Sequence, residues 1–237
     1  MRVLSFSEVG CIRRQNEDRV LSMPEYGVWA VADGMGGEQA GEVAAQMALD
    51  YLREQTARRC GEANAAQWFA EALSGANREI YTLAGQDADK RGMGTTVTAL
   101  FIEDRQALIA HVGDSRAYLW RNQVLSQLTK DHSLVGELVR RGQITEDEAD
   151  VHPQKNILTQ AVGTMPEIEV DTSRWLVQAG DVLFLCTDGV SNMVSDAELS
   201  ERLRSSELNE DFMQALKELI FQRGAKDNFT ALLCVVE

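Results

Sequence analysis

Four short apolar runs in the sequence are each bounded by an aspartate, and this pattern limits the folds open to the chain. GVWAVA, ALIAHV and VLFLC end just before Asp33, Asp114 and Asp188, and NFTALLCVV follows directly on Asp227. Short apolar runs that stop at turn residues are typical of buried strands. The sequence therefore predicts buried strands with carboxylates at their ends.

Groups of strands alternate with pairs of helices along the rest of the chain. Apolar residues at helical spacing predict two long helices, near 39–59 and 65–85, and two further helices are expected near 195–204 and 209–223. The expected strands are 2–9, 19–23, 27–32, 95–102, 107–112, 117–121, 169–176, 181–186 and 229–236. This order predicts an α+β fold in which helices pack outside antiparallel sheets. Since no linker or repeat interrupts the chain, we expect one domain over 1–237.

A polar segment, residues 133–156, separates two of the strand groups and reads as largely helical. Within it Thr145 and Glu148 have the spacing of a capping box, in which each residue satisfies a backbone N–H of the other.

Composition excludes several classes of protein. The net charge of −14 disfavours nucleic acid as a partner, because phosphate backbones are bound by Lys and Arg. No apolar run is long enough to span a membrane, and the first residues do not form a secretory signal, so we expect a cytoplasmic protein. The cysteines lack CxxC spacing and are expected to be reduced thiols: Cys11, Cys60, Cys186 and Cys234.

The four aspartates have two interpretations. Taken singly, an aspartate beside a glycine is ordinary turn chemistry. Taken together at the ends of buried strands, they would repel one another by ~4 kcal/mol per close pair at an effective dielectric near 20, so either some of them hold protons or a metal ion lies among them. Oxygen ligands select Mg²⁺, Mn²⁺ or Ca²⁺ over zinc. Arg13, in a turn between strands, could bind phosphate or simply face solvent.

Eight segments, in order, resemble the metal-dependent protein phosphatase family, also called protein phosphatase 2C, in its compact bacterial form. They are GCIRRQNED, VADGMGG, MGTTVTAL, HVGDSRAYL, LTKDHS, ILTQAVG, LFLCTDGV and KDNFTALL, and they extend from Gly10 to Leu233. The resemblance implies a four-layer sandwich, with two central antiparallel sheets flanked by pairs of helices. It also implies hydrolysis of phosphoserine and phosphothreonine in proteins by metal-activated water, without a phosphoenzyme intermediate.

The resemblance also assigns metal ligands. Asp33 matches the residue that bridges two Mn²⁺ or Mg²⁺ ions, and the carbonyl of Gly34 matches a ligand of one of them. Asp188 and Asp227 match the ligands that complete the other ion's site, and Asp114 with Asp188 matches a weaker third site.

Further roles are implied around the metals. Arg13 matches the arginine that grips the substrate phosphate, and Glu17 and Asp18 match acids that contact metal-bound water or support the site. Residues 133–156 match a mobile flap beside the cleft. Met35 departs from the pattern, because some members have a histidine there as general acid; metal-bound water, His111 and His132 are the candidate donors instead. We expect a monomer that acts on phosphorylated proteins and opposes a serine/threonine kinase.

Other classes of protein are less consistent with the sequence. A cysteine phosphatase needs an arginine six residues after its cysteine, but Cys11, Cys60 and Cys186 are followed there by Glu17, Ala66 and Asn192. Ser115 lies in a near match to the serine hydrolase elbow, yet a strand rather than a helix is expected after it. The serious alternative is a catalytically idle domain that binds phosphoproteins or senses metal.

Overall fold

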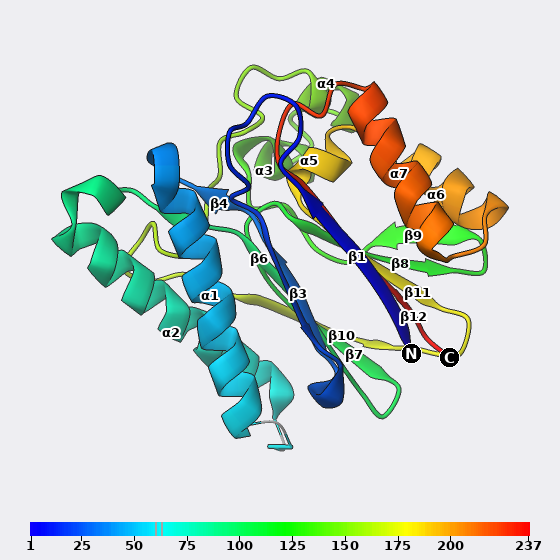
Figure 1. Ribbon diagram of the computed structural model, residues 1–237, viewed down its shortest axis with the longest axis horizontal. Helices are drawn as coiled ribbons and strands as arrows, with labels where there is room; N and C mark the ends of the chain where they lie inside the picture. Colours follow the sequence, from blue (N-terminus) through cyan, green and yellow to red (C-terminus); the bar gives the residue numbers. More distant parts are fainter. Residues whose placement is uncertain (60, 63) are drawn as a thin grey trace.

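Two five-stranded antiparallel sheets lie face to face at the centre of the molecule (Figure 1). The structure is a computed structural model and describes residues 1–59, 61, 62 and 64–237. In spatial order, the first sheet consists of β10 (Asp171–Leu176), β7 (Gln106–Val112), β6 (Val97–Glu103), β3 (Val28–Ala32) and β2 (Arg19–Met23). The second consists of β1 (Arg2–Glu8), β12 (Phe229–Val235), β11 (Val182–Cys186), β8 (Arg116–Arg121) and β9 (Val124–Gln127).

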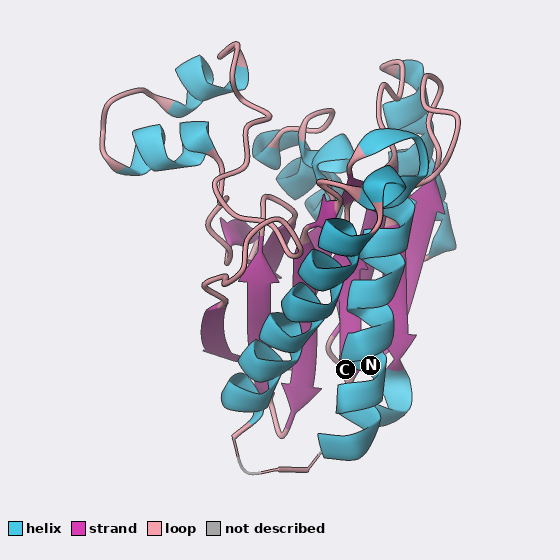
Figure 2. Cartoon of the chain, turned by 90° about the vertical axis from the view of Figure 1, so that its left-hand side faces the viewer, coloured by secondary structure: helices cyan, strands magenta, loops and turns pink. Residues whose placement is uncertain are grey.

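Helices cover the outer face of each sheet. The long helices α1 (Gly37–Arg59) and α2 (Ala65–Gln86) lie side by side across the first sheet (Figure 2). Helices α6 (Asp196–Ser205) and α7 (Glu210–Gln222) cover the second. Three apolar clusters fill the spaces between layers, one under each helix pair and one between the sheets. The predicted four-layer sandwich is confirmed.

The strands β3, β11 and β12 owe their position to their sequence. All five residues of β3 and of β11 are buried, as are the first six of β12, because both faces of these central strands are covered. A strand with no polar face cannot lie at a surface, so the aspartate next to the end of each such strand marks the edge of the sandwich.

Residues 133–156 contain two short helices, α3 (Leu134–Arg140) and α4 (Glu146–Asp150), at the top edge in Figure 1. The predicted capping box at Thr145 and Glu148 is confirmed at the start of α4. A β-bridge between Ser133 and Leu158 joins the two ends of the segment.

Several short elements were not predicted. The edge strand β9 follows a tight turn in which Asn122 and Gln123 have φ of 51° and 66°, a hairpin geometry that neither residue's type signals strongly. The one-turn helix α5 (Asp188–Ser191), the paired strands β4 (Gly34–Met35) and β5 (Gly94–Thr95), and the 3₁₀ turns η1 (Pro24–Tyr26) and η2 (Ala88–Lys90) are too short to show periodicity.

Two remaining observations concern cysteines and membranes. Cys11, Cys186 and Cys234 are free thiols, and Cys60 lies outside the described residues. Among the helices of the described chain, none combines the length and apolar character that crossing a bilayer requires.

Candidate active site

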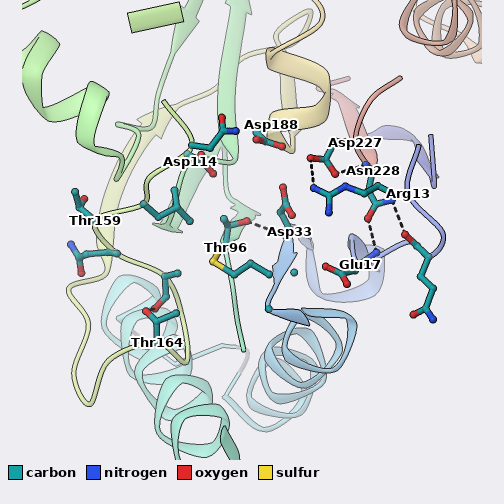
Figure 3. A pocket seen from close by; sticks show the side chains of 18 of the residues that line it. Arg13, Glu17, Asp33, Thr96, Asp114, Thr159, Thr164, Asp188, Asp227 and Asn228 are labelled. Atoms are coloured by element: carbon teal, nitrogen blue, oxygen red, sulfur yellow. Dashed lines mark hydrogen bonds and ion pairs between the residues drawn. The ribbon is translucent and has the colours of Figure 1, made fainter. Parts of the chain in front are cut away.

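The four aspartates that bound the apolar runs meet at one cavity of about 930 Å³. Asp33, Asp114, Asp188 and Asp227 all line it, and Figure 3 shows the first three side by side, with Asp227 beside them. Glu17, Gly34 and Arg13 line the same cavity. Residues from five separate parts of the sequence therefore face one space.

Antiparallel pairing explains this convergence. In the second sheet Cys186 pairs with Ala231, so the end of β11 lies beside the start of β12, and Asp188 comes close to Asp227. In the first sheet Val31 pairs with Thr98 and Val97 with Val112, so the start of β6 lies between the ends of β3 and β7.

Hydroxyl groups at the start of β6 hold the backbone of Asp33. The N–H of Asp33 donates to Oγ1 of Thr96 at 3.0 Å, and the carbonyl of Asp33 accepts from Oγ1 of Thr95 at 2.9 Å and from the N–H of Thr96 at 2.8 Å. Oγ1 of Thr96 also lies 2.6 Å from Oγ of Ser115. Thr95 and Thr96 both lie within the segment MGTTVTAL, but nothing in the sequence pattern predicts their role.

Two glycines allow α1 to approach the site. A Cβ on Gly34 would lie 2.2 Å from the carbonyl oxygen of Gly41, and a Cβ on Gly41 would lie 2.6 Å from Oε2 of Glu17. Any larger residue would separate α1 from the Asp33–Gly34 turn. Gly34, which has no side chain, consequently lines the cavity.

Arg13 forms an ion pair with Asp227 rather than standing alone. Its Nη2 donates to Oδ2 of Asp227 at 2.8 Å, while 53% of its side-chain surface remains exposed. This hydrogen bond raises the pKa of the guanidinium above its usual value. The other oxygen of Asp227 accepts from the N–H of Asn228 at 2.8 Å.

Asp18 lies behind the cavity and is 1% exposed. Its Oδ2 accepts from Oγ1 of Thr187 at 2.8 Å, but its Oδ1 has no hydrogen-bond partner among the described residues. Burial is the main reason that its pKa rises to about 7. Burial also raises the pKa of Glu17. A buried carboxylate oxygen without a donor indicates an unsatisfied demand for positive charge or a proton.

The carboxyl groups of Asp33, Asp114 and Asp188, which form the floor of the cavity, also lack enough compensating positive charge among the described residues. Burial, followed by the charges of Asp18, Asp188 and Asp114, raises the pKa of Asp33 well above its usual value. Burial and the charge of Asp188 raise the pKa of Asp114 to about 8. Burial and the charge of Asp227 raise the pKa of Asp188. At neutral pH these carboxyls must therefore either hold protons or share a cation.

This oxygen-rich floor fits hard divalent cations. Carboxylates and a backbone carbonyl are the donors that Mg²⁺ and Mn²⁺ prefer, and the orphaned Oδ1 of Asp18 suits a donor such as coordinated water. Within the described residues, however, no three metal-binding side chains already stand at ion-cage spacing.

The alternative catalytic residues are not placed for chemistry in this cavity. His111 and His132 are buried and do not line it: His111 contacts Oγ1 of Thr98 at 2.9 Å, and His132 accepts from the N–H of Gly113 at 3.2 Å. Ser115 is fully buried and β8 follows it, as expected for a hairpin rather than a hydrolase elbow. Met35 does line the cavity and offers no proton.

The geometry can now be compared with known proteins. The profile described as protein phosphatase 2C matches residues 14–234. The chain belongs to the protein phosphatase 2C family. It is 41% identical to the serine/threonine phosphatase stp of Listeria innocua over 231 residues, which cover 94% of this chain and 91% of that one. It is 40% identical to the protein phosphatase PhpP of Streptococcus pneumoniae, with 98% and 96% covered.

Solved structures of the protein phosphatase 2C family have the same fold as this chain. The serine/threonine phosphatase PstP/Ppp of Mycobacterium tuberculosis superimposes with a TM-score of 0.90 at 35% identity, covering 100% of this chain and 98% of that one. A catalytic domain of PstP in complex with two manganese ions superimposes with a TM-score of 0.88 at 34% identity, with 100% and 98% covered.

Proposed function

We propose that the acid-lined cavity is where this chain, a metal-dependent protein serine/threonine phosphatase, removes phosphate from other proteins. The observation that carries the proposal is the convergence of Asp33, Asp114, Asp188 and Asp227 on one cavity beside Arg13. Two Mn²⁺ or Mg²⁺ ions bound there would lower the pKa of water and neutralise charge on the phosphoryl oxygens. The two manganese ions of the PstP catalytic domain support this cofactor.

Each residue of the site has a proposed role. Asp33, the carbonyl of Gly34, Asp188 and Asp227 would hold the two ions, and Asp114 with Asp188 would offer a weaker third position. Thr95 and Thr96 fix the backbone of Asp33 and so direct its carboxylate into the cavity.

Arg13, Glu17 and Asp18 act around the ions. The guanidinium of Arg13 has a planar set of donors that matches a phosphate group, and about half of its side chain already faces solvent beside the cavity. With Asp227 serving as a metal ligand, Arg13 would be free to bind two phosphate oxygens and to stabilise their charge as the bond to the serine or threonine oxygen breaks. Glu17 and Asp18 accept hydrogen bonds from water in the site. The leaving oxygen takes its proton from water, since Met35 has none to give.

The biological setting is also a proposal. The free thiols at Cys11, Cys186 and Cys234 support a reducing compartment, for which we propose the cytoplasm. We further propose that the protein is a monomer and reverses the action of a serine/threonine kinase on shared target proteins.

Hydrolysis of p-nitrophenyl phosphate and of a phosphothreonine peptide tests the proposal. We expect turnover of both substrates with Mn²⁺ and none after EDTA treatment. Arg13→Ala should mainly raise KM for the peptide, because one phosphate contact is lost. A purified protein that binds Mn²⁺ but hydrolyses neither substrate would instead be the idle binding domain considered above.

A further inference from the structure

The loop that carries Arg13 rests on the segment that carries Asp227. This loop, residues 10–16, connects β1 to β2 and is called the Arg13 loop here. At its start the N–H of Cys11 donates to the carbonyl of Ala225 at 2.8 Å. Gly10 has a φ of 77°, and a Cβ there would lie 2.3 Å from the carbonyl oxygen of Asp227. The loop and residues 225–227 are therefore in direct backbone contact.

One side chain closes the base of the Arg13 loop. Nδ2 of Asn228 donates to the carbonyl of Val9 at 2.8 Å and to the carbonyl of Gln15 at 2.9 Å, and its Oδ1 accepts from the N–H of Glu17 at 2.8 Å. Asn228 is 5% exposed, so water does not compete for these bonds. The side chain of Asn228 therefore joins the backbone just before the loop, at Val9, to the backbone at its other end, at Gln15 and Glu17.

The chemistry of this clamp requires an amide. Two backbone carbonyls need two donors and one N–H needs an acceptor, and a carboxamide provides all three on one short side chain. Aspartate would offer no donor, and alanine would leave two buried carbonyls and one N–H without partners.

We propose that Asn228 is a positioning residue for Arg13: by closing the base of the Arg13 loop it aims the guanidinium into the cavity and so raises the affinity for phosphate. The arginine side chain is long, half exposed and held by one ion pair to Asp227, so the direction of its guanidinium depends on the position of the Arg13 backbone. A fixed backbone at Arg13 lowers the conformational entropy that is lost when the side chain binds phosphate. The inference rests on the phosphate-binding role proposed for Arg13.

Asn77 provides a matched control. It is 1% exposed; its Nδ2 donates to the carbonyls of Met165 and Pro166 at 2.9 and 3.2 Å, and its Oδ1 accepts from the N–H of Gly163 at 2.7 Å. Asn77 thus clamps a second loop of the cavity wall with the same set of bonds. That loop, residues 163–166, carries no charged residue. Removing either clamp should cost similar stability, but one of them alone acts on Arg13.

The experiment measures the dissociation constant of inorganic phosphate for the Mn²⁺-saturated protein, by calorimetry and by inhibition of p-nitrophenyl phosphate hydrolysis. Arg13→Ala should weaken phosphate binding ~10- to 100-fold, the range for charge-assisted hydrogen bonds. Asn228→Ala should weaken it ~10-fold, and Asn77→Ala less than about twofold. In the Arg13→Ala background, Asn228→Ala should have no further effect, because the side chain it positions is gone.

Two additions keep the result clear. The Mn²⁺ concentration that gives half of the full rise in melting temperature is measured for each variant, since Asn228 adjoins Asp227, and phosphate is titrated well above it. If Asn228→Ala does not fold, Asn228→Ser replaces it; one hydroxyl restores part of the clamp, and we expect a weakening of about threefold.

The outcomes distinguish failure of the positioning role of Asn228 from failure of the proposed phosphatase function. Equal weakening by Asn228→Ala with and without Arg13, or an equal effect of Asn77→Ala, would overturn the positioning role and leave the phosphatase proposal intact. An unchanged phosphate constant in Arg13→Ala would overturn the role of Arg13 and this inference together. Absence of Mn²⁺-dependent turnover in the unmodified protein would count against the proposed function. Phosphate binding could still be measured by calorimetry in that case, because calorimetry does not require turnover.

Discussion

Replacing Asp114 by asparagine should stabilise the metal-free protein at pH 8. Burial and the charge of Asp188 raise the pKa of Asp114 from 3.8 to about 8. The folded protein therefore holds this proton more tightly than the unfolded chain, and each rise in pH between these values lowers the stability of the fold. Asparagine has the same shape and no charge to bury.

The size of the effect follows from the pKa. At ~1.4 kcal/mol per pH unit, the loss between pH 3.8 and about 8 is at most ~6 kcal/mol. The cavity is open to water, which screens the charges, so we expect about 2 kcal/mol. For a chain of 237 residues this corresponds to a rise in melting temperature of ~4–8 °C at pH 8. At pH 5 only ~1.2 of these ~4.2 pH units have been crossed, so the difference should fall to about 0.6 kcal/mol.

The assay is thermal unfolding of both proteins in EDTA at pH 5 and pH 8. Asp181→Asn is the control with the opposite sign. Burial would raise the pKa of Asp181, but the hydrogen bonds from Arg121 and from the N–H of Gln178 outweigh it and hold the pKa low, so this variant should melt below the unmodified protein at pH 8. An Asp114→Asn protein that melts no higher than the unmodified one at pH 8, or whose advantage is as large at pH 5 as at pH 8, would refute the conclusion that burial and neighbouring carboxylates raise the pKa of Asp114.

Three further predictions concern the same region. Asp188→Asn should abolish turnover and weaken Mn²⁺ binding while circular dichroism stays unchanged; near-normal activity would remove Asp188 from the site. Gly189→Ala would place a Cβ 1.9 Å from the carbonyl oxygen of Asn228, so it should cost ~1–3 kcal/mol of stability and weaken Mn²⁺ binding, and an unaffected melting temperature would contradict this. Burial and the neighbouring His132 lower the pKa of His111 to about 4, so the unfolded chain takes up the proton first, and stability should fall by ~3 kcal/mol from pH 6.5 to pH 4 relative to His111→Gln; parallel pH profiles in urea unfolding would show that His111 is not buried uncharged.

Local signals were sufficient to predict antiparallel sheets with helices outside them, and the family resemblance supplied the four layers. The apolar runs before Asp33 and Asp188 have no polar face, and only a covered strand accommodates them. The long helices α1 and α2 were predicted from their apolar spacing and length. Local signals failed where elements were short: β9 has only four, mostly exposed residues, and its strand state comes from pairing with β8.

The aspartates could be named from the sequence because four of them stand together at the ends of buried strands, although any one alone would be ordinary turn chemistry, and because they match the family's motifs. The residues that support them could not. Thr95, Thr96, Thr187 and Asn228 are ordinary polar residues at strand starts and ends, and their roles depend on partners distant in the chain, such as Asp33 for Thr96. Sequence spacing holds no information about such pairings.

The state of the acids also required the structure. The family resemblance gives Arg13 a phosphate to bind, but in the structure its guanidinium pairs with Asp227. A cationic side chain placed within reach of an acid satisfies it whenever no stronger cation does. Whether Arg13 serves the phosphate or the aspartate is a competition that no single motif describes.

The most direct test of the account is an anomalous difference map from crystals grown with Mn²⁺. The account predicts two manganese peaks in the cavity, bound by the carboxylates of Asp33, Asp188 and Asp227, with Arg13 released from Asp227. A map from crystals at saturating Mn²⁺ that shows no peak among these carboxylates, and the Arg13–Asp227 pair intact, would contradict it.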